Sequence, residues 1–392
     1  MANISDKSRD AFMLEGPLAE KGYDWWWNSF TGYHEQTGEE KSFFVEFFVC
    51  NPNIGGNEVL FGQKKGNLQN KDAAKQVDGQ YTKGHEVQPV PSYLMVKCGA
   101  WGDDHAQLHR FFAWDEVQIR RGDNFGVKST DCYLDEVKSK GTVTVSREDA
   151  EKHPEWMSDA GSMSWRLKIN KKVAFHVGYG ASKFFRKLNA FEMFWHAEGM
   201  KTEYDGYVIY NGERYIIKPE NCYGYADKNW GADFTSPWVW LSSNNLKSNL
   251  TGEKLTDSVF DIGGGRPKVL GIALNRKLLS DFWYEGKSYE FNFSKFWTVC
   301  RTKFECHETD TQVIWHVEQK TLTAKMIADI VCEKKDMLLF NYEAPNGKKL
   351  HNRLWNGGNG TGRIQLYRKA GLNYKLIDDI EVRNVGCEYG EY

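Results

Sequence analysis

The chain has few of the features that mark membrane-spanning or nucleic-acid-binding proteins. No apolar run in its 392 residues approaches the ~20 residues of a membrane-spanning helix. Its 51 Lys and Arg residues are balanced by 53 Asp and Glu residues, whereas a general nucleic-acid binder carries a surplus of positive charge to meet phosphates. We therefore predict no transmembrane segment and no nucleic-acid partner. The sequence leaves the oligomeric state open.

Paired cysteines and a leader-like N-terminus are also lacking. The eight cysteines are scattered, with no Cys-x-x-Cys pair, so we interpret them as free thiols in a reducing compartment. The first 30 residues contain acidic side chains and no apolar segment of the signal-peptide kind. Together these observations predict a cytoplasmic location.

Motifs that bind metals or nucleotides are missing as well. Cys300, Cys306 and His307 lack the close paired spacing of zinc ligands. Gly263-Gly264-Gly265 opens no predicted helix, which a dinucleotide site requires. Neither a P-loop nor a Gly-x-Ser-x-Gly elbow is present. We predict no cofactor and no metal site.

Aromatic side chains, in contrast, are abundant. The 15 Trp, 19 Tyr and 23 Phe residues make up 15% of the chain, and 37 Gly stand beside only 9 Pro. Aromatic residues favour strands, and Gly permits tight hairpin turns. Alternating runs at 42–49, 141–145, 312–317 and 363–367 indicate strands. The sequence therefore predicts an all-β protein with an aromatic interior or pocket.

Two similar hairpins indicate two β units. Segments 210–215 and 284–289 both place Gly at the third position between Tyr ends, and 345–348 is a candidate third copy. No linker rich in Pro, Gly or Ser separates the two halves. We predict two antiparallel β-barrel or β-sandwich domains packed together, with the first at 1–278 and the second at 279–392.

Other elements are few. The first domain should contain a long polar loop at 62–87 and a short helix that begins at Ser146. Segment 322–331 fits either a short helix or a strand.

The segment richest in candidate chemistry runs from Tyr225 to Asn244. Asp227, Lys228 and Asn229 stand among Tyr and Trp residues in a predicted loop. Desolvation by aromatic walls raises the pKa of a carboxyl, which can then donate a proton near neutral pH. A surface turn with a solvated Lys228 is the alternative.

The strand that follows this loop alternates Trp238, Trp240 and Asn244 along one face. Such a face suits a pocket for an apolar ligand with a polar head. It equally fits a core strand whose Asn is satisfied by backbone groups.

Two further aromatic segments are candidates. Trp25 and Trp26 belong to a run of three tryptophans that must be covered on both faces of a strand. Trp195 is followed by His196 and Glu198, which share the opposite face of a strand and could serve in catalysis. Core packing explains the tryptophans, and a structural His with a surface-paired Glu explains the second segment, without any catalytic role.

The order of several motifs is distinctive. Trp101-Gly102-Asp103-Asp104-His105 is similar to a Trp-Gly-Asp-x-His motif, and the segments 24–28, 46–52, 263–265 and 286–291 also find counterparts in one family. Most specific is the run from Tyr225 to Gly231 with the Trp-x-Trp at 238–240 and Asn244. Plant enzymes carry Tyr-Ser-Glu-Lys-Asn-Trp-Gly, Trp-Phe-Trp and Asn at these places. Through nearly the whole chain, the sequence resembles the tocopherol cyclase family.

This resemblance implies a pair of lipocalin-like β domains that catalyse redox-neutral cyclisation or hydration of prenylated or polyene substrates. The chain departs from the plant pattern in three ways: Asp227 replaces Glu, His196 and Glu198 have no ionisable counterparts, and the plant transit peptide is missing.

The function predicted from these observations is cofactor-free cyclisation, isomerisation or hydration of a hydrophobic aromatic or prenylated molecule. The catalytic candidates are Asp227 as the acid, with His196 and Glu198 as a second choice. The substrate-binding candidates are Trp25, Trp26, Trp195, Tyr225, Lys228, Asn229, Trp230, Trp238, Trp240 and Asn244. The alternatives are a lipocalin-like binding protein that uses the same pocket without chemistry and, more weakly, a carbohydrate-active protein with paired carboxylates.

Overall fold

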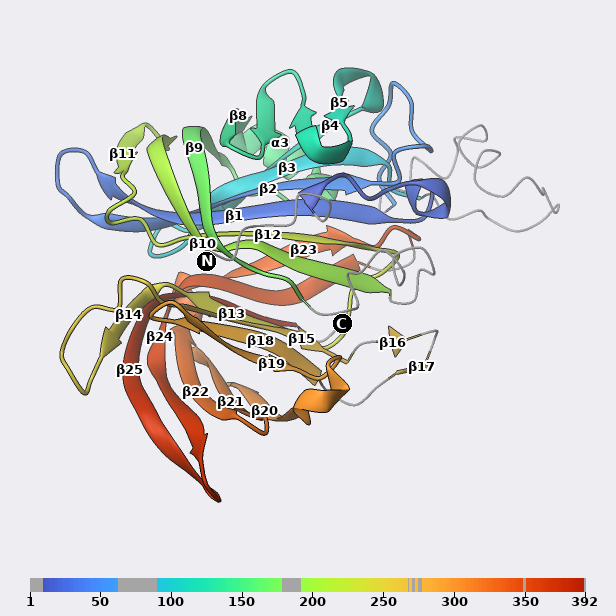
Figure 1. Ribbon diagram of the computed structural model, residues 1–392. Coiled ribbons are helices and arrows are strands. Elements are labelled where there is room, and N and C mark those ends of the chain that lie inside the picture. Colours follow the sequence, from blue (N-terminus) through green and yellow to red (C-terminus); the bar gives the residue numbers. More distant parts are fainter. Residues whose placement is uncertain are drawn as a thin grey trace.

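Two large antiparallel β-sheets, one above the other, make up the protein (Figure 1). The computed structural model describes residues 10–62, 90–177, 192–266, 268–269, 272–273, 277–347 and 350–390. Among these residues, the helical elements are short 3-10 turns and one α-helix of six residues. The predicted all-β fold with two packed antiparallel units is confirmed.

The first sheet contains twelve strands and takes in the N-terminal part of the chain. Its long central strands are aromatic and β-branched, as the alternating sequence runs predict. The strands are β1 (Tyr23–His34), β2 (Glu40–Cys50), β3 (Tyr93–Ala100), β4 (Ala106–Phe112), β5 (Gln118–Arg120), β6 (Gly126–Lys128), β7 (Cys132–Asp135), β8 (Lys138–Val145), β9 (Gly161–Phe175), β10 (Met193–Tyr210), β11 (Glu213–Ile217) and β12 (Gly224–Gly231).

The second sheet contains eleven strands. They are β13 (Trp238–Ser243), β14 (Asn245–Ser248), β15 (Val259–Gly265), β18 (Lys277–Tyr284), β19 (Lys287–Asn292), β20 (Arg301–Glu308), β21 (Gln312–Lys320), β22 (Ala324–Glu333), β23 (Leu338–Glu343), β24 (Leu350–Ala370) and β25 (Asn373–Gly390). A separate two-stranded ribbon pairs β16 (Lys268–Val269) with β17 (Ile272–Ala273).

The helical segments are short and lie between strands. They are the 3-10 turns η1 (Gly16–Ala19), η3 (Trp114–Glu116), η4 (Gly122–Asn124), η5 (Pro154–Trp156), η7 (Phe296–Thr298) and η8 (Lys334–Asp336), and the α-helix α3 (Arg147–Lys152). Helix α3 begins where the sequence predicts it, because the Ser146 hydroxyl accepts a hydrogen bond from the Asp149 amide. Segment 322–331, which fitted helix or strand, lies mostly in β22.

Both aromatic hairpins form as predicted. Asn211 and Gly212, with φ of 49° and 90°, connect β10 to β11, and Glu285 and Gly286, with φ of 42° and 80°, connect β18 to β19. Positive φ at both central residues is the geometry of the turn that twisted two-stranded ribbons prefer. Of the third copy, residues 345–347 follow β23, and residue 348 lies outside the described residues. The polar loop predicted at 62–87 lies, beyond Gly62, outside the described residues.

The change from one sheet to the other falls between Gly231 and Trp238. Strands β13 to β15, which the predicted boundary at 278 assigns to the first domain, pair within the second sheet. The boundary between the two sheets therefore lies about forty residues before the predicted domain boundary at 278. The division into folding domains stays a prediction.

Three large hydrophobic clusters hold the described part of the molecule together. One fills the concave side of the first sheet, one fills the second sheet, and the third lies between the sheets and draws residues from both. Among the described residues, no helix has the length and apolar character needed to cross a membrane.

Candidate active site

Most residues of the cluster between the two sheets are aromatic, and we call it the aromatic layer. Successive strand residues point to opposite faces, so the odd-numbered residues of β1 and β12 face the second sheet. The first sheet contributes Tyr23, Trp25, Trp27, Phe44, Phe48, Trp195 and Tyr225, and the second contributes Trp238, Trp240, Phe340 and Tyr342. Four predicted tryptophans, Trp25, Trp195, Trp238 and Trp240, are thus brought together.

Asp227 lies in this layer as a buried carboxyl. The segment predicted as a loop is strand β12, which pairs with β1 on one side and β10 on the other. All eight residues of the strand are buried, so the surface-turn alternative is wrong. Because β12 is paired on both edges, its backbone groups have hydrogen-bond partners in the sheet. Asp227 can therefore be buried among aromatic rings without leaving backbone groups unpaired.

The surroundings of Asp227 favour its protonated form. The Trp195 indole donates to Oδ2 at 2.8 Å and the Tyr225 hydroxyl lies 3.2 Å from the same oxygen. Oδ1 is buried and has no hydrogen-bond partner among the described residues. Desolvation raises the pKa of Asp227 to about 8, with the Trp195 hydrogen bond opposing the rise and the nearby Glu388 adding to it.

Tyr225 connects Asp227 to a second aspartate across the sheet interface. Its hydroxyl is 3.2 Å from Oδ2 of Asp261 on β15, and the Trp240 indole donates to Asp261 Oδ1 at 3.1 Å. A tyrosine hydroxyl has one proton, so it can donate to only one of the two carboxylates. Hydrogen bonding to both therefore requires one protonated aspartate. Burial also raises the pKa of Asp261, and the charge of Asp227 adds to that rise.

A second set of polar side chains in the layer contacts Glu388 of β25. The Trp238 indole donates to Glu388 at 2.6 Å, and Asn356 of β24 donates at 2.6 Å. Burial raises the pKa of Glu388 to about 7. Across the interface, the Tyr342 hydroxyl donates to Glu46 at 2.9 Å, and Lys97 lies 3.7 Å from that carboxyl. Desolvation lowers the pKa of Lys97 to about 8.

Other polar atoms in the layer also have no hydrogen-bond partner among the described residues. They are the indole nitrogens of Trp25 and Trp27, Nδ2 of Asn229 and Oε1 of Glu46. Oδ1 of Asn229 accepts from the Tyr23 hydroxyl at 2.7 Å. Buried polar groups are nearly always hydrogen-bonded, and exceptions gathered in one place call for an explanation. Donors and an acceptor aimed into an aromatic region are what a partly polar ligand would use.

Several predicted site residues lie on the opposite face of the first sheet. Trp26, Lys228 and His196 are cross-strand neighbours there, and Trp230 points the same way. Lys228 forms a buried ion pair with Asp24, and its ammonium lies 3.8 Å from the Trp26 ring centroid. Desolvation lowers the pKa of Lys228. These residues are therefore separated from Asp227 by the thickness of the sheet.

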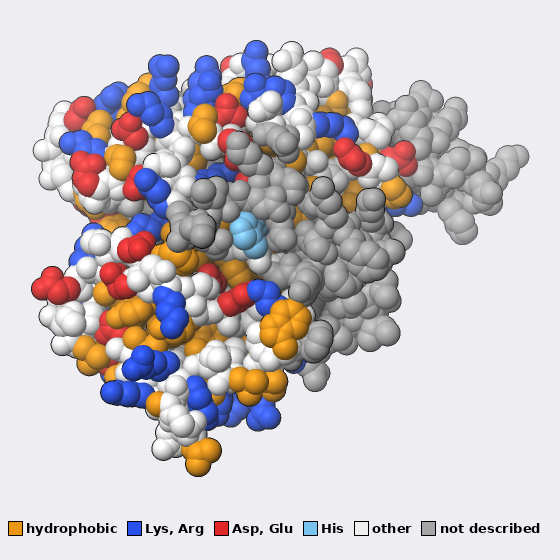
Figure 2. All heavy atoms as spheres, in the orientation of Figure 1, with side chains coloured by type: hydrophobic (Ala, Val, Ile, Leu, Met, Phe, Trp, Pro, Cys, Tyr) orange, Lys and Arg blue, Asp and Glu red, His pale blue; other side chains and the backbone are white. Residues whose placement is uncertain are grey.

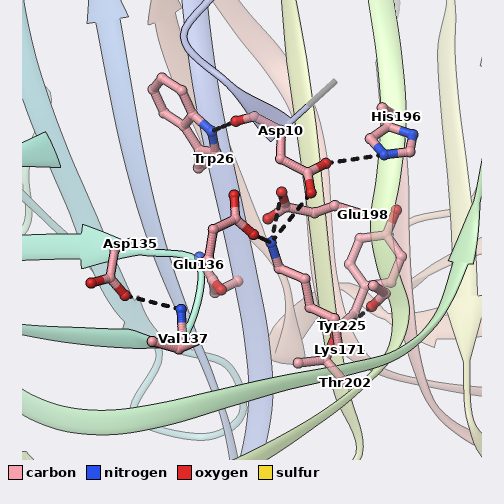
Figure 3. Close-up of polar contacts among 12 residues, drawn as sticks. Asp10, Trp26, Asp135, Glu136, Val137, Lys171, His196, Glu198, Thr202 and Tyr225 are labelled. Atoms are coloured by element: carbon pink, nitrogen blue, oxygen red, sulfur yellow. Dashed lines mark hydrogen bonds and ion pairs between the residues drawn. The ribbon is translucent and has the colours of Figure 1, made fainter. Parts of the chain in front are cut away.

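His196 and Glu198 belong to a buried ionic cluster of their own (Figure 3). Nε2 of His196 is 3.1 Å from Asp10. The Lys171 ammonium lies 2.9 Å from both Glu136 and Glu198 and 4.0 Å from Asp10. The three carboxylates come close enough to hold a metal ion, but the lysine already supplies positive charge between them.

Asn244 takes the structural role that was the alternative for it. It follows the last residue of β13, and its Nδ2 donates to the Gly224 carbonyl at 2.8 Å. The sequence analysis missed Asp261, Glu46 and Glu388. Glu46 and Asp261 each lie in a run of buried, mostly apolar strand residues, and a carboxylate inside such a run is the signal that could have found them. Glu388 lies in a strand with several exposed and partly exposed residues, so the sequence offers no such signal for it.

The chain matches one protein family over more than half of its length. A family model described as tocopherol cyclase-like matches residues 134–391. A rice protein (Oryza sativa subsp. japonica) named "Probable tocopherol cyclase, chloroplastic" is 36% identical over 104 residues, which are 26% of this chain and only 20% of that protein.

Two solved structures match over most of the chain at low sequence identity. Kievitone hydratase from Nectria haematococca has a TM-score of 0.46 and 10% identity, and the match covers 99% of this chain and 95% of that one. CghA has a TM-score of 0.45 and 9% identity, with 95% and 89% covered.

Proposed function

Because the chain belongs to the tocopherol cyclase-like family, we propose that it is a cyclase-type enzyme that acts on a hydrophobic aromatic or prenylated small molecule in the aromatic layer. The proposed reaction begins when a carboxylic acid donates its proton to a carbon–carbon double bond of the substrate. A hydroxyl oxygen of the same substrate then attacks the resulting carbocation, and loss of the hydroxyl proton restores the acid. No electrons are transferred overall, so the proposal includes no cofactor.

One observation carries this proposal: the Asp227 carboxyl is buried between aromatic side chains, and one of its oxygens has no hydrogen-bond partner among the described residues. A general acid must be protonated at the working pH and must reach the substrate. The raised pKa of about 8 meets the first requirement. The unpartnered Oδ1 supports the second, because it leaves one carboxyl oxygen available to a substrate.

The aromatic walls have a role of their own in the proposal. A carbocation in an apolar site needs nearby electron density, and a cation over the face of a Trp or Tyr ring gains ~0.5–2 kcal/mol. Trp195 and Tyr225 contact the Asp227 carboxyl directly, and the Trp240 ring lies 4.8 Å from that of Tyr225. We assign these rings to cation stabilisation. Trp25 and Asn229, with buried unpartnered donors, would orient the substrate oxygen.

The remaining candidates are assigned to structure rather than to substrate. Trp26, Lys228, Trp230, His196 and Glu198 lie behind the sheet, and Asn244 holds the Gly224 carbonyl. The cytoplasmic location also stays a prediction, since the rice relative is named as chloroplastic.

The test of the proposed function is incubation of the purified protein, without added cofactor, with prenylated quinols, polyenes and chalcone-type phenols. Mass spectrometry of the products separates the hypotheses. A product of unchanged mass indicates cyclisation or isomerisation, and a gain of one water indicates hydration. A retained but unchanged ligand would refute the enzyme and leave a binding protein.

The pH dependence of turnover should respond to Glu388. Turnover requires protonated Asp227, so it should fall as pH rises through about 8. The Glu388 charge raises the pKa of Asp227, so Glu388→Gln should move this fall to lower pH. Glu381→Gln, on the same strand but partly exposed and ion-paired with Arg383, is the matched control and should leave the profile in place. Identical profiles for Glu388→Gln and the unmodified enzyme would contradict the assignment of the acid.

A further inference from the structure

A groove lies on the outer surface of the first sheet, away from the aromatic layer. It has a volume of about 650 Å³ and is formed by β6, β7, β8, β9 and β10. Four cationic side chains line it: Lys128, Lys138, Lys140 and Arg166. Figure 2 shows Lys and Arg side chains gathered along the top of the molecule, over the strands of this sheet. The chain as a whole has a net charge of −2, so this concentration of positive charge is local.

The groove contains a row of residues that are direct cross-strand neighbours. The row runs from Lys128 to Tyr133, Lys140, Arg166 and Tyr207 across five strands. Lys140 and Arg166 therefore stand opposite each other, with tyrosines rather than acids on either side. Like charges directly opposite each other destabilise a sheet.

Neighbouring charges elsewhere on this face are compensated. Lys168 also stands opposite a lysine, Lys138, but its ammonium lies 3.1 Å from Asp205 on the next strand. The groove's one acidic residue, Asp131, is 2.7 Å from Arg110. Within the described part of the chain, no carboxylate lies within ion-pair distance of Lys128, Lys140 or Arg166. Three of the four cations that line the groove are thus uncompensated by a carboxylate among the described residues.

We propose that this groove binds a ligand that bears at least two phosphate groups. The cations supply charge, and Arg166 can donate two parallel hydrogen bonds to one phosphate. Hydroxyls of Thr142, Ser164 and Tyr207 line the same space and add neutral donors. The repulsion between Lys140 and Arg166 is relieved when anionic oxygens lie between them. Functional sites often lower the stability of the ligand-free protein in this way.

The proposal is tested on the full-length protein with inorganic pyrophosphate as the probe, by calorimetry and by the shift in Tm. The unmodified protein should bind pyrophosphate, and binding should weaken as salt is added. The double variant Lys140→Gln with Arg166→Gln should bind roughly 100-fold more weakly, since each charge-assisted hydrogen bond accounts for about tenfold or more. Its Tm without ligand should rise slightly, because the repulsion is gone. Lys303→Gln with Lys375→Gln removes the same charge from exposed positions of the second sheet and is the control.

A parallel arm uses vesicles of phosphatidylcholine with and without phosphatidylinositol bisphosphate. Binding to free pyrophosphate points to a soluble ligand, and binding only to the anionic vesicles points to a lipid headgroup. Both support the proposal if the groove variant loses them and the control does not. Absence of binding in both arms, or equal loss in the groove variant and the control, would overturn it.

Discussion

Replacing Asp227 with Asn should lower turnover by roughly 10²–10⁴-fold, the usual contribution of a positioned general acid. Asn has nearly the same shape and can still accept the hydrogen bond from Trp195, but it has no acidic proton to transfer. Substrate affinity should therefore change little. Turnover is measured by product formation in the panel assay, and affinity by quenching of tryptophan fluorescence.

A matched control for this variant is Asp378→Asn. Asp378 is also a buried aspartate, but it lies on β25 and accepts hydrogen bonds from Ser248 and Tyr284 away from the aromatic layer. Its variant should keep full turnover. If Asp227→Asn keeps its turnover, the acid is another residue. If the loss of turnover is matched by a loss of thermal stability, Asp227 has a structural role.

The raised pKa of Asp227 also predicts how the stability of the protein depends on pH. The pKa of Asp227 is raised from 3.8 to about 8 in the folded protein, so the folded state holds a proton that the unfolded state has released. Stability from this group is therefore complete below about pH 4 and is lost as pH rises through about 8. Asp227→Asn should flatten this decline, which runs from about pH 4 to about pH 8, the unfolded and folded pKa values of the group.

Replacing Lys171 with Met should destabilise the protein by about 3–5 kcal/mol, because it leaves a buried carboxylate cluster without its cation. Burial alone would lower the pKa of Lys171, but Glu198, Asp10 and Glu136 raise it above its ordinary value. The lysine is therefore charged, and its loss exposes the acids to one another. The free energy of unfolding is measured by urea denaturation at neutral pH.

The control for Lys171 is its exposed neighbour on the same strand. Lys168 is 81% exposed and forms an ion pair with Asp205, so Lys168→Met should change stability by less than about 1 kcal/mol. Adding Glu198→Gln to Lys171→Met should recover part of the loss, since it removes one of the unpaired charges. A loss below about 1 kcal/mol for Lys171→Met would show that the cluster is not held by its lysine.

The fold was predictable because the relevant signals are local. Alternation over five to eight residues predicts strands, and the Gly at the third position of a Tyr-bounded segment predicts both hairpins. Segment 225–229 shows where local reading fails: Asp, Lys and Asn disfavour strands, but pairing of β12 with β1 and β10 overrides that preference.

The site was predictable only in part, because its members meet through tertiary structure. Asp227 and the tryptophans of one face follow from aromatic neighbours in sequence. Asp261 joins them across the sheet interface, 36 residues from Tyr225, and nothing local connects the two. His196 and Glu198 were good candidates by type, but strand alternation combined with the sheet pairing places them behind Asp227, where Lys171 and Asp10 satisfy them.

The central claim is that Asp227 delivers a proton to substrate carbon. The most direct measurement is the panel reaction in D2O, because the Asp227 proton exchanges with solvent and a carbon–deuterium bond does not exchange afterwards. The account predicts a product that carries one deuterium on carbon with the unmodified enzyme, and almost none of that product with Asp227→Asn. A product without carbon-bound deuterium, or the same deuterated product at the same rate from Asp227→Asn, would contradict it.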